Sequence, residues 1–429
     1  MNIQNGFLFF GSILIAMSCS SVKQLALKRD ITEILKKSEV FSKHHTGLSI
    51  YDIDNRRYLS NYNADLLFTP ASNTKLLTMF ATLASFHDSI PALLYEKTPM
   101  ALRIKPLAEP TLLAEEFQNQ AVFNFLQRQD AIEVVFPEDV PPYGPGWAWD
   151  DYQYSFQAQR SWWPIYKNAL KISKDSTTIT VIPPFFKDFT EIRENNLFDN
   201  TLTRNLKYNN FTAYINNDTS AFESYIPFDS SKDLFVQLLS DTLNVPIAIS
   251  ETDFIAQDTI YGQHVDTLLT KMMKPSDNFL AEQLFIQAAW KNGFESIEEY
   301  IDHLKITSLS GLDDMVWVDG SGLSRYNLIS PKNQVKLLKI CLDEFGWDRL
   351  IKIFPSGGEG TLEKLYLSDT PFIYAKTGTL SNNHNLSGFL ITKSGRRLVF
   401  SFMNNHFICP ISNVKKAMEE LLMQIRTSY

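Results

Sequence analysis

Cysteine is scarce in this sequence, and several common metal-binding and catalytic patterns are missing. Its three cysteines, Cys19, Cys341 and Cys409, cannot all pair with one another, and none belongs to a CxxC pair, so a disulfide scaffold and an all-cysteine zinc site are excluded. Whether Cys341 and Cys409 pair stays open. The sequence has no HExxH pair and no GxSxG elbow, and the glycines of residues 319–322 belong to no phosphate-loop pattern and predict a tight turn. Neither a metal nor a cofactor is therefore expected.

Long runs of charge of one sign are also missing. Lys and Arg number 40 and Asp and Glu number 48, which gives a net charge of -8 spread along the chain. A protein that neutralises many phosphates needs a basic surface, so a nucleic-acid partner is not expected. Hydrophobic residues are plentiful, at 44% of 429 residues, and they are enough to form the cores of about two or three domains.

An apolar run near the start predicts export. Residues 7–17 are too few to span a bilayer core of about 30 Å comfortably, and they indicate a signal peptide over residues 1–18. Small residues precede Cys19, which resembles a bacterial lipobox, so we expect a mature chain that begins at a lipidated Cys19 and continues as a tether over residues 19–30. This predicts a periplasmic protein held by lipid to a membrane of the bacterial envelope. An ordinary cleaved signal or an uncleaved anchor stays open, because no Lys or Arg precedes the run and Met17 is bulky.

The two ends of the chain show similar patterns, which predict one discontinuous domain formed by residues 31–96 and 228–429. Alternating apolar residues predict strands, and longer apolar or amphipathic stretches predict helices. The expected strands are 47–53, 57–59, 372–375, 386–392 and 397–402, and the expected helices are 75–84 and 414–425. Because residues 75–84 are apolar almost all round, this helix is expected at the centre of the domain.

Residues 97–227 have a different composition, rich in Pro, Asn and aromatic residues, and predict an inserted β-rich domain. Short strand patterns occur at 102–104, 132–136 and 178–182. Trp147 and Trp149 are expected in the core of this domain, because large aromatic side chains bury much apolar area.

The histidines fit no catalytic pattern, and each is expected at the surface or as a helix cap: His44, His45, His87, His264, His303, His384 and His406. A serine can instead be activated by a lysine that burial keeps neutral, and residues three apart at a helix start share one face. Ser-x-x-Lys begins at Ser20, Ser72 and Ser412. Ser20 lies in the expected tether, and Ser412 is expected to cap the last helix. Only Ser72 precedes the apolar helix, where it places Lys75 in the first turn.

Two further patterns accompany Ser72 and Lys75. Ser276-Asp277-Asn278 precedes a helical pattern, and Lys376-Thr377-Gly378-Thr379 lies on an expected strand. Similar short sequences occur elsewhere in the chain: Ser381-Asn382-Asn383 resembles the first motif and Lys393-Ser394-Gly395 resembles the second. A hairpin turn explains Lys393-Ser394-Gly395. Ser-x-x-Lys at the start of a buried helix, then Ser-x-Asn, then Lys-Thr-Gly on a strand is the signature of penicillin-recognising serine enzymes.

On these motifs the sequence resembles the penicillin-binding-protein superfamily, and most closely the D-alanyl-D-alanine carboxypeptidase/endopeptidase family of low-molecular-mass class C. The segments that look like this family are 69–78, 146–151, 319–328 and 376–380, within a resemblance that covers residues 45–427. It implies an α/β (α+β) fold of the penicillin-binding-protein and serine β-lactamase type, with an antiparallel sheet flanked by helices and an inserted β-rich domain. Residues 157–163 depart from the family's small-residue pattern, in the part that would select the substrate.

The resemblance implies roles for the residues of the first two motifs. Ser72 would be the nucleophile that attacks the carbonyl between two D-alanines, and Lys75 would accept its proton. Ser276 would relay a proton to the leaving amine. Asn278 would orient Lys75 and hold the substrate amide.

The resemblance also implies roles for the Lys-Thr-Gly strand. Lys376 would supply positive potential and, with Thr377, bind the terminal carboxylate of the substrate. The strand that carries Thr379 would donate a backbone N–H, which would form the oxyanion hole with that of Ser72. Gly378 would let the substrate backbone approach the strand closely.

The implied activity is that of a penicillin-sensitive serine DD-peptidase that hydrolyses D-Ala-D-Ala as a carboxypeptidase, with D-Ala-diaminopimelate cross-links as endopeptidase substrates. Peptidoglycan stem peptides are the implied substrates, and β-lactam antibiotics are the implied covalent inhibitors. Two alternatives stay open. One is a non-catalytic envelope lipoprotein that binds peptidoglycan. The other is a β-lactamase-like hydrolase, which would need a water-activating glutamate that no recognisable loop supplies.

Overall fold

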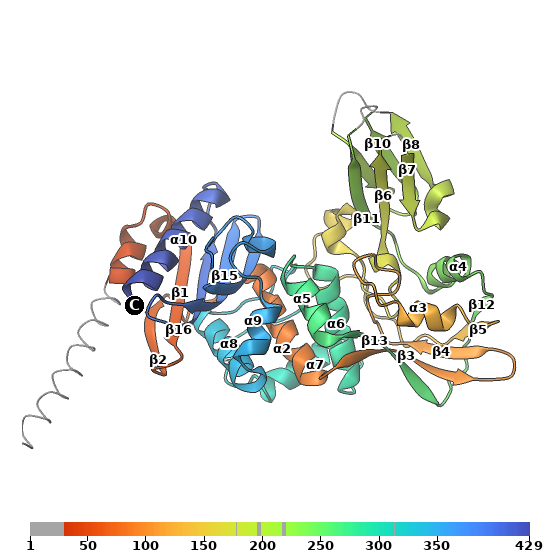
Figure 1. Ribbon diagram of the computed structural model, residues 1–429, viewed down its shortest axis with the longest axis horizontal. Coiled ribbons are helices and arrows are strands. Elements are labelled where there is room, and N and C mark those ends of the chain that lie inside the picture. The colour runs from red at the N-terminus through yellow and green to blue at the C-terminus, as the bar shows by residue number, and fades with distance from the viewer. Residues whose placement is uncertain (1–29, 177, 195–198, 217–219, 313) are drawn as a thin grey trace, which may run out of the picture. The chain divides into compact units, whose positions relative to one another are not determined.

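The computed structural model describes residues 30–176, 178–194, 199–216, 220–312 and 314–429 (Figure 1). The chain forms two compact units. Of the described residues, the first unit comprises those from 30 to 73 together with 311–316 and 328–429, and the second comprises those of 74–310 and 317–327. The expected signal peptide, Cys19 and nearly all of the expected tether lie outside the described residues.

The elements are labelled as in Figure 1. After a helix over residues 30–37, the α-helices are α2 (Lys75–Ser85), α3 (Ala121–Leu126), α4 (Lys232–Leu243), α5 (Val265–Met273), α6 (Asn278–Lys291), α7 (Ile297–Ile306), α8 (Pro331–Phe345), α9 (Trp347–Ile353) and α10 (Ile411–Ser428). The short 3-10 helix η2 (Ala71–Thr74) leads directly into α2. Within the described ranges, a helix of the length and hydrophobicity needed to cross a membrane is not found.

The strands of the first unit form one five-stranded antiparallel sheet in the order β14-β15-β16-β1-β2. Their bounds are β1 (His45–Asp52), β2 (Arg57–Tyr62), β14 (Ile373–Leu380), β15 (Asn383–Ile391) and β16 (Arg397–Asn405). The expected hairpins of both chain ends are thereby confirmed, and they share one sheet because β1 pairs with β16. The turn between β15 and β16 contains Gly395 at φ 84, a conformation that glycine adopts without a steric penalty.

Helices cover both faces of this sheet (Figure 1). On one face, Ile50 and Phe400 belong to a core cluster with Met418 of α10 and with the helix over residues 30–37. On the other face, Phe389 packs edge-on against Trp347 of α9. This three-layer arrangement buries both faces, which explains why nearly every residue of β15 and of β16 is buried, polar residues included.

Two expectations about single residues of the first unit need comment. The prediction that Ser412 caps the last helix is wrong, because Pro410 is the N-cap residue and Ser412 lies inside α10. Cys341 is buried in α8, while Cys409 is half-buried, and both are free thiols. The structure therefore resolves the open question, and the two cysteines do not form a disulfide.

The helical core of the second unit is formed by α2 and α6, with α5 and α7 packed against α6. Nearly every residue of α2 is buried, as its largely apolar sequence predicts. Its one charged residue is Lys75, whose side chain is buried at the first turn of the helix. A charged group in such a place needs hydrogen-bond partners, and these partners define half of the candidate site.

Three sheets make up the rest of the second unit. They are a five-stranded sheet β12-β5-β4-β3-β13, and two three-stranded sheets, β8-β10-β9 and β11-β6-β7. The bounds are β3 (Ser89–Lys97), β4 (Leu102–Pro106), β5 (Ile132–Val134), β6 (Ala169–Asp175), β7 (Thr178–Ile182), β8 (Thr190–Glu194), β9 (Thr201–Arg204), β10 (Phe211–Ile215), β11 (Phe222–Pro227), β12 (Ile247–Ile249) and β13 (Asp258–His264). The five-stranded sheet combines β4 and β5, which lie within residues 97–227, with β12 and β13, which lie outside them. The sheets therefore do not delimit the expected insert, which stays a prediction.

Two aromatic or heteroaromatic residues differ from expectation. Trp149 is 74% exposed, so its assignment to a core is wrong, while Trp147 is half-buried and donates from Nε1 to Asp319. His384 was expected at the surface or as a cap, but it is only 3% exposed within β15. The sequence pattern misses its burial because a polar residue between Asn383 and Asn385 carries no signal that this end of the strand is covered.

Candidate active site

The segment that leads to Ser72 is tied to the sheet of the first unit. Asn385 of β15 donates from Nδ2 to the main-chain oxygens of Thr69 and Pro70, both at 2.9 Å. Asn405 of β16 accepts from the main-chain N–H of Thr69 at 2.7 Å. These bonds fix the main chain immediately before η2, the element that carries Ser72.

Asn73 connects this segment to the Lys-Thr-Gly strand. Its side-chain Nδ2 donates to the main-chain oxygen of Lys376 at 2.9 Å, and its Oδ1 accepts from the hydroxyl of Ser387 at 2.7 Å. Asn73 is fully buried, so both of its polar ends are satisfied inside the protein. Sequence reasoning did not single out Asn73, although it stands inside the Ser72 motif.

The motif residues of β14 lie in a crowded environment. Lys376 is buried and donates from Nζ to the main-chain oxygen of Thr377 at 2.9 Å. The hydroxyl of Thr377 donates to that of Thr361 at 2.8 Å. A Cβ atom on Gly378 would come within 2.2 Å of the main-chain oxygen of Pro70. The close approach that requires glycine here is therefore made by the protein's own main chain.

His384 lies opposite Thr379 in the β14–β15 pair. Its Nδ1 is 2.8 Å from the hydroxyl of Thr379, whose side chain stands at the exposed end of β14. Burial, and to a smaller extent the positive charges of Lys415 and Lys376, lower the pKa of His384 to about 3. The imidazole is therefore neutral at physiological pH and orients Thr379 without adding charge.

In the second unit, Lys75 has two oxygen partners. Its Nζ donates to Oδ1 of Asn278 at 2.5 Å and to the main-chain oxygen of Ser321 at 2.8 Å. Burial lowers the pKa of Lys75 to about 8, against the opposing effect of the carboxylates of Glu282, Asp277 and Asp319. A neutral amine has two N–H bonds and one lone pair, so these two acceptors can bind both hydrogens and leave the lone pair to accept a proton.

The Ser-x-Asn motif lies at the start of α6, as expected. Ser276 has a left-handed backbone at φ 68, and Asp277 caps the helix by accepting from the N–H of Leu280 at 2.8 Å. The other carboxylate oxygen of Asp277 accepts from Nζ of Lys167 at 2.5 Å. This ion pair fixes Asp277, which lies between Ser276 and Asn278. The sequence analysis did not single out Lys167.

The turn at residues 319–322 completes this part of the site. Oδ1 of Asp319 accepts from the N–H of Gly322 at 2.9 Å, and Oδ2 accepts from the N–H of Ser324 at 2.8 Å, so one buried carboxylate closes the turn. Thr78 of α2 donates to the main-chain oxygen of Gly320 at 2.6 Å. The expected tight turn is confirmed, and it presents the oxygen of Ser321 to Lys75.

A cavity of about 460 Å³ within the second unit adjoins the Ser-x-Asn motif. Its lining includes Ser276 and Asn278 together with Phe156, Lys167 and Tyr225. A cavity of this size can hold a small peptide fragment. Among the residues that the structure describes, a cluster of three or more His, Cys, Asp or Glu side chains able to hold a metal ion is not found.

The sequence-predicted residues thus fall into two sets. Ser72, Lys376, Thr377, Gly378 and Thr379 lie in the first unit, where the bonds of Asn73 join the Ser72 segment to β14. Lys75, Ser276 and Asn278 lie in the second unit, where Lys75 and Asn278 are in direct contact. The chain passes from one unit to the other between Asn73 and Thr74.

Comparison with known proteins gives matches to one family. Residues 27–92 and 240–425 match the D-Ala-D-Ala carboxypeptidase 3 (S13) family. D-alanyl-D-alanine carboxypeptidase DacB of Haemophilus influenzae is 33% identical over 150 residues, which cover 32% of this chain and 31% of that protein. Carboxypeptidase DacB of Mycolicibacterium smegmatis is 30% identical over 151 residues, which cover 32% and 33%. The chain therefore spans about a third of the length of these two relatives.

The fold has solved counterparts. The crystal structure of penicillin binding protein 4 (dacB) from Haemophilus influenzae is similar with a TM-score of 0.71 at 19% identity, covering 92% of this chain and 98% of that one. The structure of the same protein complexed with a β-lactam has a TM-score of 0.65 at 18% identity, with the same coverage. The expected fold class is therefore confirmed.

Proposed function

The chain belongs to the D-Ala-D-Ala carboxypeptidase 3 (S13) family, and on this premise we propose that it is a serine DD-peptidase that hydrolyses the D-Ala-D-Ala end of peptidoglycan stem peptides. The observation that carries the proposal is the state of Lys75. It is a buried amine with a lowered pKa and two oxygen partners, three residues after Ser72 in a continuous helical segment. A lysine in this state is suited to remove a proton from a serine hydroxyl.

The proposed reaction has two stages. The hydroxyl oxygen of Ser72 attacks the carbonyl carbon between the two D-alanines, and Lys75 takes the hydroxyl proton. A proton passes through Ser276 to the nitrogen of the terminal D-Ala, the C–N bond breaks, and an ester on Ser72 forms. Water then attacks the ester, and its proton returns to Ser72 as the shortened peptide leaves. Asn278 holds Lys75 throughout, through its Oδ1.

The strand β14 supplies the binding groups in this proposal. The ammonium of Lys376 and the hydroxyl of Thr377 attract the carboxylate of the terminal D-Ala. The backbone N–H groups of Ser72 and Thr379 stabilise the oxyanion, and one such donor typically contributes about 3 kcal/mol. His384 supports this arrangement because it orients Thr379 as a neutral partner.

β-Lactam antibiotics would acylate the same serine. Opening of the lactam ring gives an ester on Ser72, but the ring nitrogen stays covalently attached to the acyl group and does not leave as a D-Ala would. The proposed enzyme is therefore trapped, whereas a β-lactamase would release the product quickly. A non-catalytic peptidoglycan-binding protein would form no ester at all.

Fluorescent penicillin tests the assignment of the nucleophile. The chain is incubated with the reagent, and the labelled peptide is identified by mass; we expect the added mass on the peptide that contains Ser72. Ser72→Ala should abolish labelling, while the control Ser412→Ala, which alters a Ser-x-x-Lys of identical spacing in α10, should label as the wild type does. Label on another serine, or none, contradicts the proposal. Incubation with muropeptides should then yield free D-Ala.

The envelope location is also proposed. A peptidase of this substrate must meet peptidoglycan outside the cytoplasm, so we infer that residues 1–18 direct export and that Cys19 carries a lipid. The wild type should fractionate with membranes, and Cys19→Ser behind a standard cleavable secretion signal should be released as a soluble protein. Recovery of the unaltered wild type in the soluble periplasmic fraction contradicts the lipid anchor but leaves export standing.

Residues 97–227 are proposed to be an insert that governs access of large substrates. Replacing them by a short linker in a chain that still folds should preserve acylation by penicillin. Cleavage of cross-linked muropeptides should fall more than cleavage of a short D-Ala-D-Ala peptide. An equal loss on all three substrates would show that these residues support the catalytic core instead.

A further inference from the structure

Arg160 forms a deeply buried ion pair in the second unit. Its side chain and that of Glu282 in α6 are each 1% exposed. Both Nε and Nη2 of Arg160 donate to the same carboxylate oxygen, Oε2 of Glu282, at 2.9 and 2.6 Å. The next residues along each segment also pair, because Ser161 and Gln283 exchange hydrogen bonds of 3.1 and 2.7 Å. The Arg160 segment is thus docked onto α6 by two adjacent contacts.

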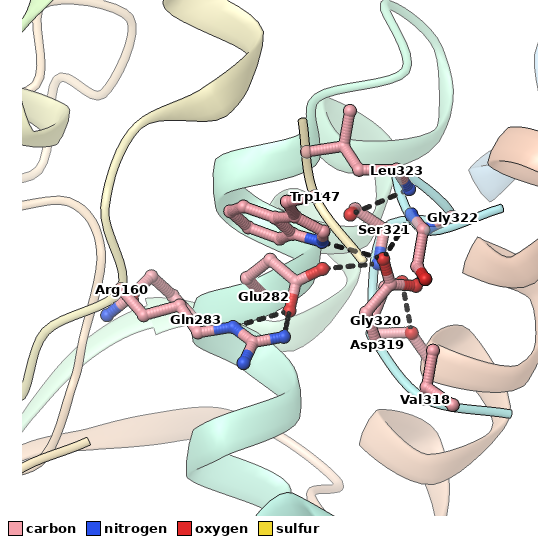
Figure 2. A network of polar contacts seen from close by, with 12 residues as sticks. Trp147, Arg160, Glu282, Gln283, Val318, Asp319, Gly320, Ser321, Gly322 and Leu323 are labelled. Carbon is pink, nitrogen blue, oxygen red and sulfur yellow. Dashed lines mark hydrogen bonds and ion pairs between the residues drawn. The ribbon is translucent and has the colours of Figure 1, made fainter. Parts of the chain in front are cut away.

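The second oxygen of Glu282 faces the turn at residues 319–322 (Figure 2). Oε1 accepts from the main-chain N–H of Ser321 at 2.7 Å, and the main-chain oxygen of Ser321 accepts from Nζ of Lys75 at 2.8 Å. A continuous series of buried contacts therefore runs from Arg160 through Glu282 and Ser321 to Lys75. Each member is held by the previous one, so a displacement of Glu282 would move an acceptor of Lys75.

Trp147 supports the same turn from the side of Arg160. Its indole Nε1 donates to Oδ2 of Asp319 at 3.0 Å, and the guanidinium of Arg160 lies over the indole ring at 5.1 Å (Figure 2). Cation–π contact of this kind favours a single position of the guanidinium. Arg160 and Trp147 together therefore hold both carboxylates, Glu282 and Asp319, that orient the turn.

Charge gives this arrangement a second consequence. Within the second unit, the carboxylates of Glu282, Asp277 and Asp319 all favour the ammonium form of Lys75. Lys167 balances Asp277, and four hydrogen-bond donors surround Asp319. Arg160 balances Glu282. Loss of the guanidinium alone would leave a buried negative charge that favours protonation of Lys75.

We propose that Arg160 is a positioning residue for Lys75, which acts through Glu282 and Ser321 to hold the amine in place and to offset the charge that would keep it protonated. This inference rests on the proposed function, in which neutral Lys75 accepts the proton of Ser72. It assigns to a residue of the proposed insert a role in the acylation step itself.

The test is the pH dependence of acylation by fluorescent penicillin in four proteins. In the wild type, the second-order rate constant should rise with pH as Lys75 loses its proton. Arg160→Met should move the midpoint of this rise upward by about one pH unit and lower the rate at pH 7 about tenfold, because one unit of pKa is a factor of ten in the neutral fraction. Glu282→Gln leaves an unbalanced guanidinium and should move the midpoint downward. The double variant should return it to the wild-type position.

A loss of simple support for the fold would not move the pH midpoint in opposite directions in the two single variants, nor restore it in the double variant. Glu282→Gln keeps the shape of the side chain, so it decides the question should Arg160→Met fail to fold. The control pair is Arg193 and Glu191, an exposed ion pair in the same proposed insert, where Arg193→Met should leave the midpoint unchanged. A midpoint that stays at the wild-type pH in Glu282→Gln overturns the inference. A wild type that penicillin does not label at Ser72 overturns the proposed function instead.

Discussion

The side-chain amide of Asn73 donates a hydrogen bond of 2.9 Å to the main-chain oxygen of Lys376, a residue 303 positions later in the chain. The side chain of Asn73 also accepts a hydrogen bond from the hydroxyl of Ser387, and the main-chain oxygen of Asn73 accepts one from the side chain of Gln334. One buried residue next to Ser72 is thus bound to β14, to β15 and to α8. Such a residue couples the stability of the first unit to the placement of two motifs of the proposed active site.

Replacement of this residue should therefore affect both properties. Asn73→Ala removes one hydrogen bond to the oxygen of Lys376 and one from the hydroxyl of Ser387, and the loss of buried hydrogen bonds of this kind costs about 1–3 kcal/mol of unfolding free energy. Acylation by penicillin should fall about a hundredfold, since about 2.7 kcal/mol of transition-state stabilisation corresponds to that factor. Urea unfolding and labelling rates measure the two effects. Asn413→Ala, at an exposed position of α10, is the control, and equal behaviour of the two variants would contradict this role.

Gly378 offers a test of close packing. The Cβ of an alanine would lie 2.2 Å from the main-chain oxygen of Pro70, so the Ser72 segment and β14 would have to separate. Gly378→Ala should lower the unfolding free energy by about 1–3 kcal/mol, the usual range for overpacking, and slow acylation more than tenfold. Gly311→Ala is the matched control, because nothing lies within 4 Å of its added Cβ. Unchanged stability and labelling in Gly378→Ala would show that the strand accommodates the methyl group.

The two motif lysines should fail in different ways. Lys75→Ala removes the proposed proton acceptor, so acylation should collapse at every pH between 6 and 10 (about 10²–10⁴-fold, the usual contribution of a general base). Lys376→Ala removes the attraction for the carboxylate, so the Michaelis constant for a D-Ala-D-Ala peptide should rise more than the turnover number falls. Steady-state kinetics on the peptide separates the two cases. Equal, mild effects of both substitutions would contradict the division of roles.

His384 should make stability fall in acid. Its folded pKa of about 3 lies below the ordinary value of 6.5, so the unfolded chain takes up a proton that the folded chain excludes as pH falls below 6.5. Linkage then predicts a loss of about 2 kcal/mol between pH 7 and pH 5. His384→Asn keeps a hydrogen-bonding group near Thr379 and should remove most of this loss. His406→Asn, at an exposed position, should retain it, and identical pH profiles for all three proteins would argue against a neutral buried imidazole.

Several elements could be predicted because their signal is local. The alternation of 47–53 and 386–392 has the period of a strand, and residues 75–84, which are apolar almost all round, leave a helix almost no polar face; all three elements are observed. The motifs around Ser72, Ser276 and Lys376 are short, and their order along the chain was sufficient to identify the family, which the match to residues 27–92 and 240–425 confirms.

Other features depend on residues far apart in the sequence. Trp149 and Trp147 are neighbours of identical type, yet one is 74% exposed and the other is held by Asp319, because only the fold places a carboxylate beside the second. His384 looked like a surface residue because nothing adjacent to it shows that the end of β15 is covered.

The sequence by itself determined the secondary structure of the sheet and the identity of the motif residues, since periodicity and short motifs are carried by neighbouring residues. Only the tertiary structure decided what surrounds those residues. The lowered pKa of Lys75, the bonds of Asn73 to β14 and the ion pair of Arg160 with Glu282 arise from burial and from contacts between distant segments. Burial and charge act through space, and the order of residues in a chain does not record which side chains the fold will bring within 3 Å of one another.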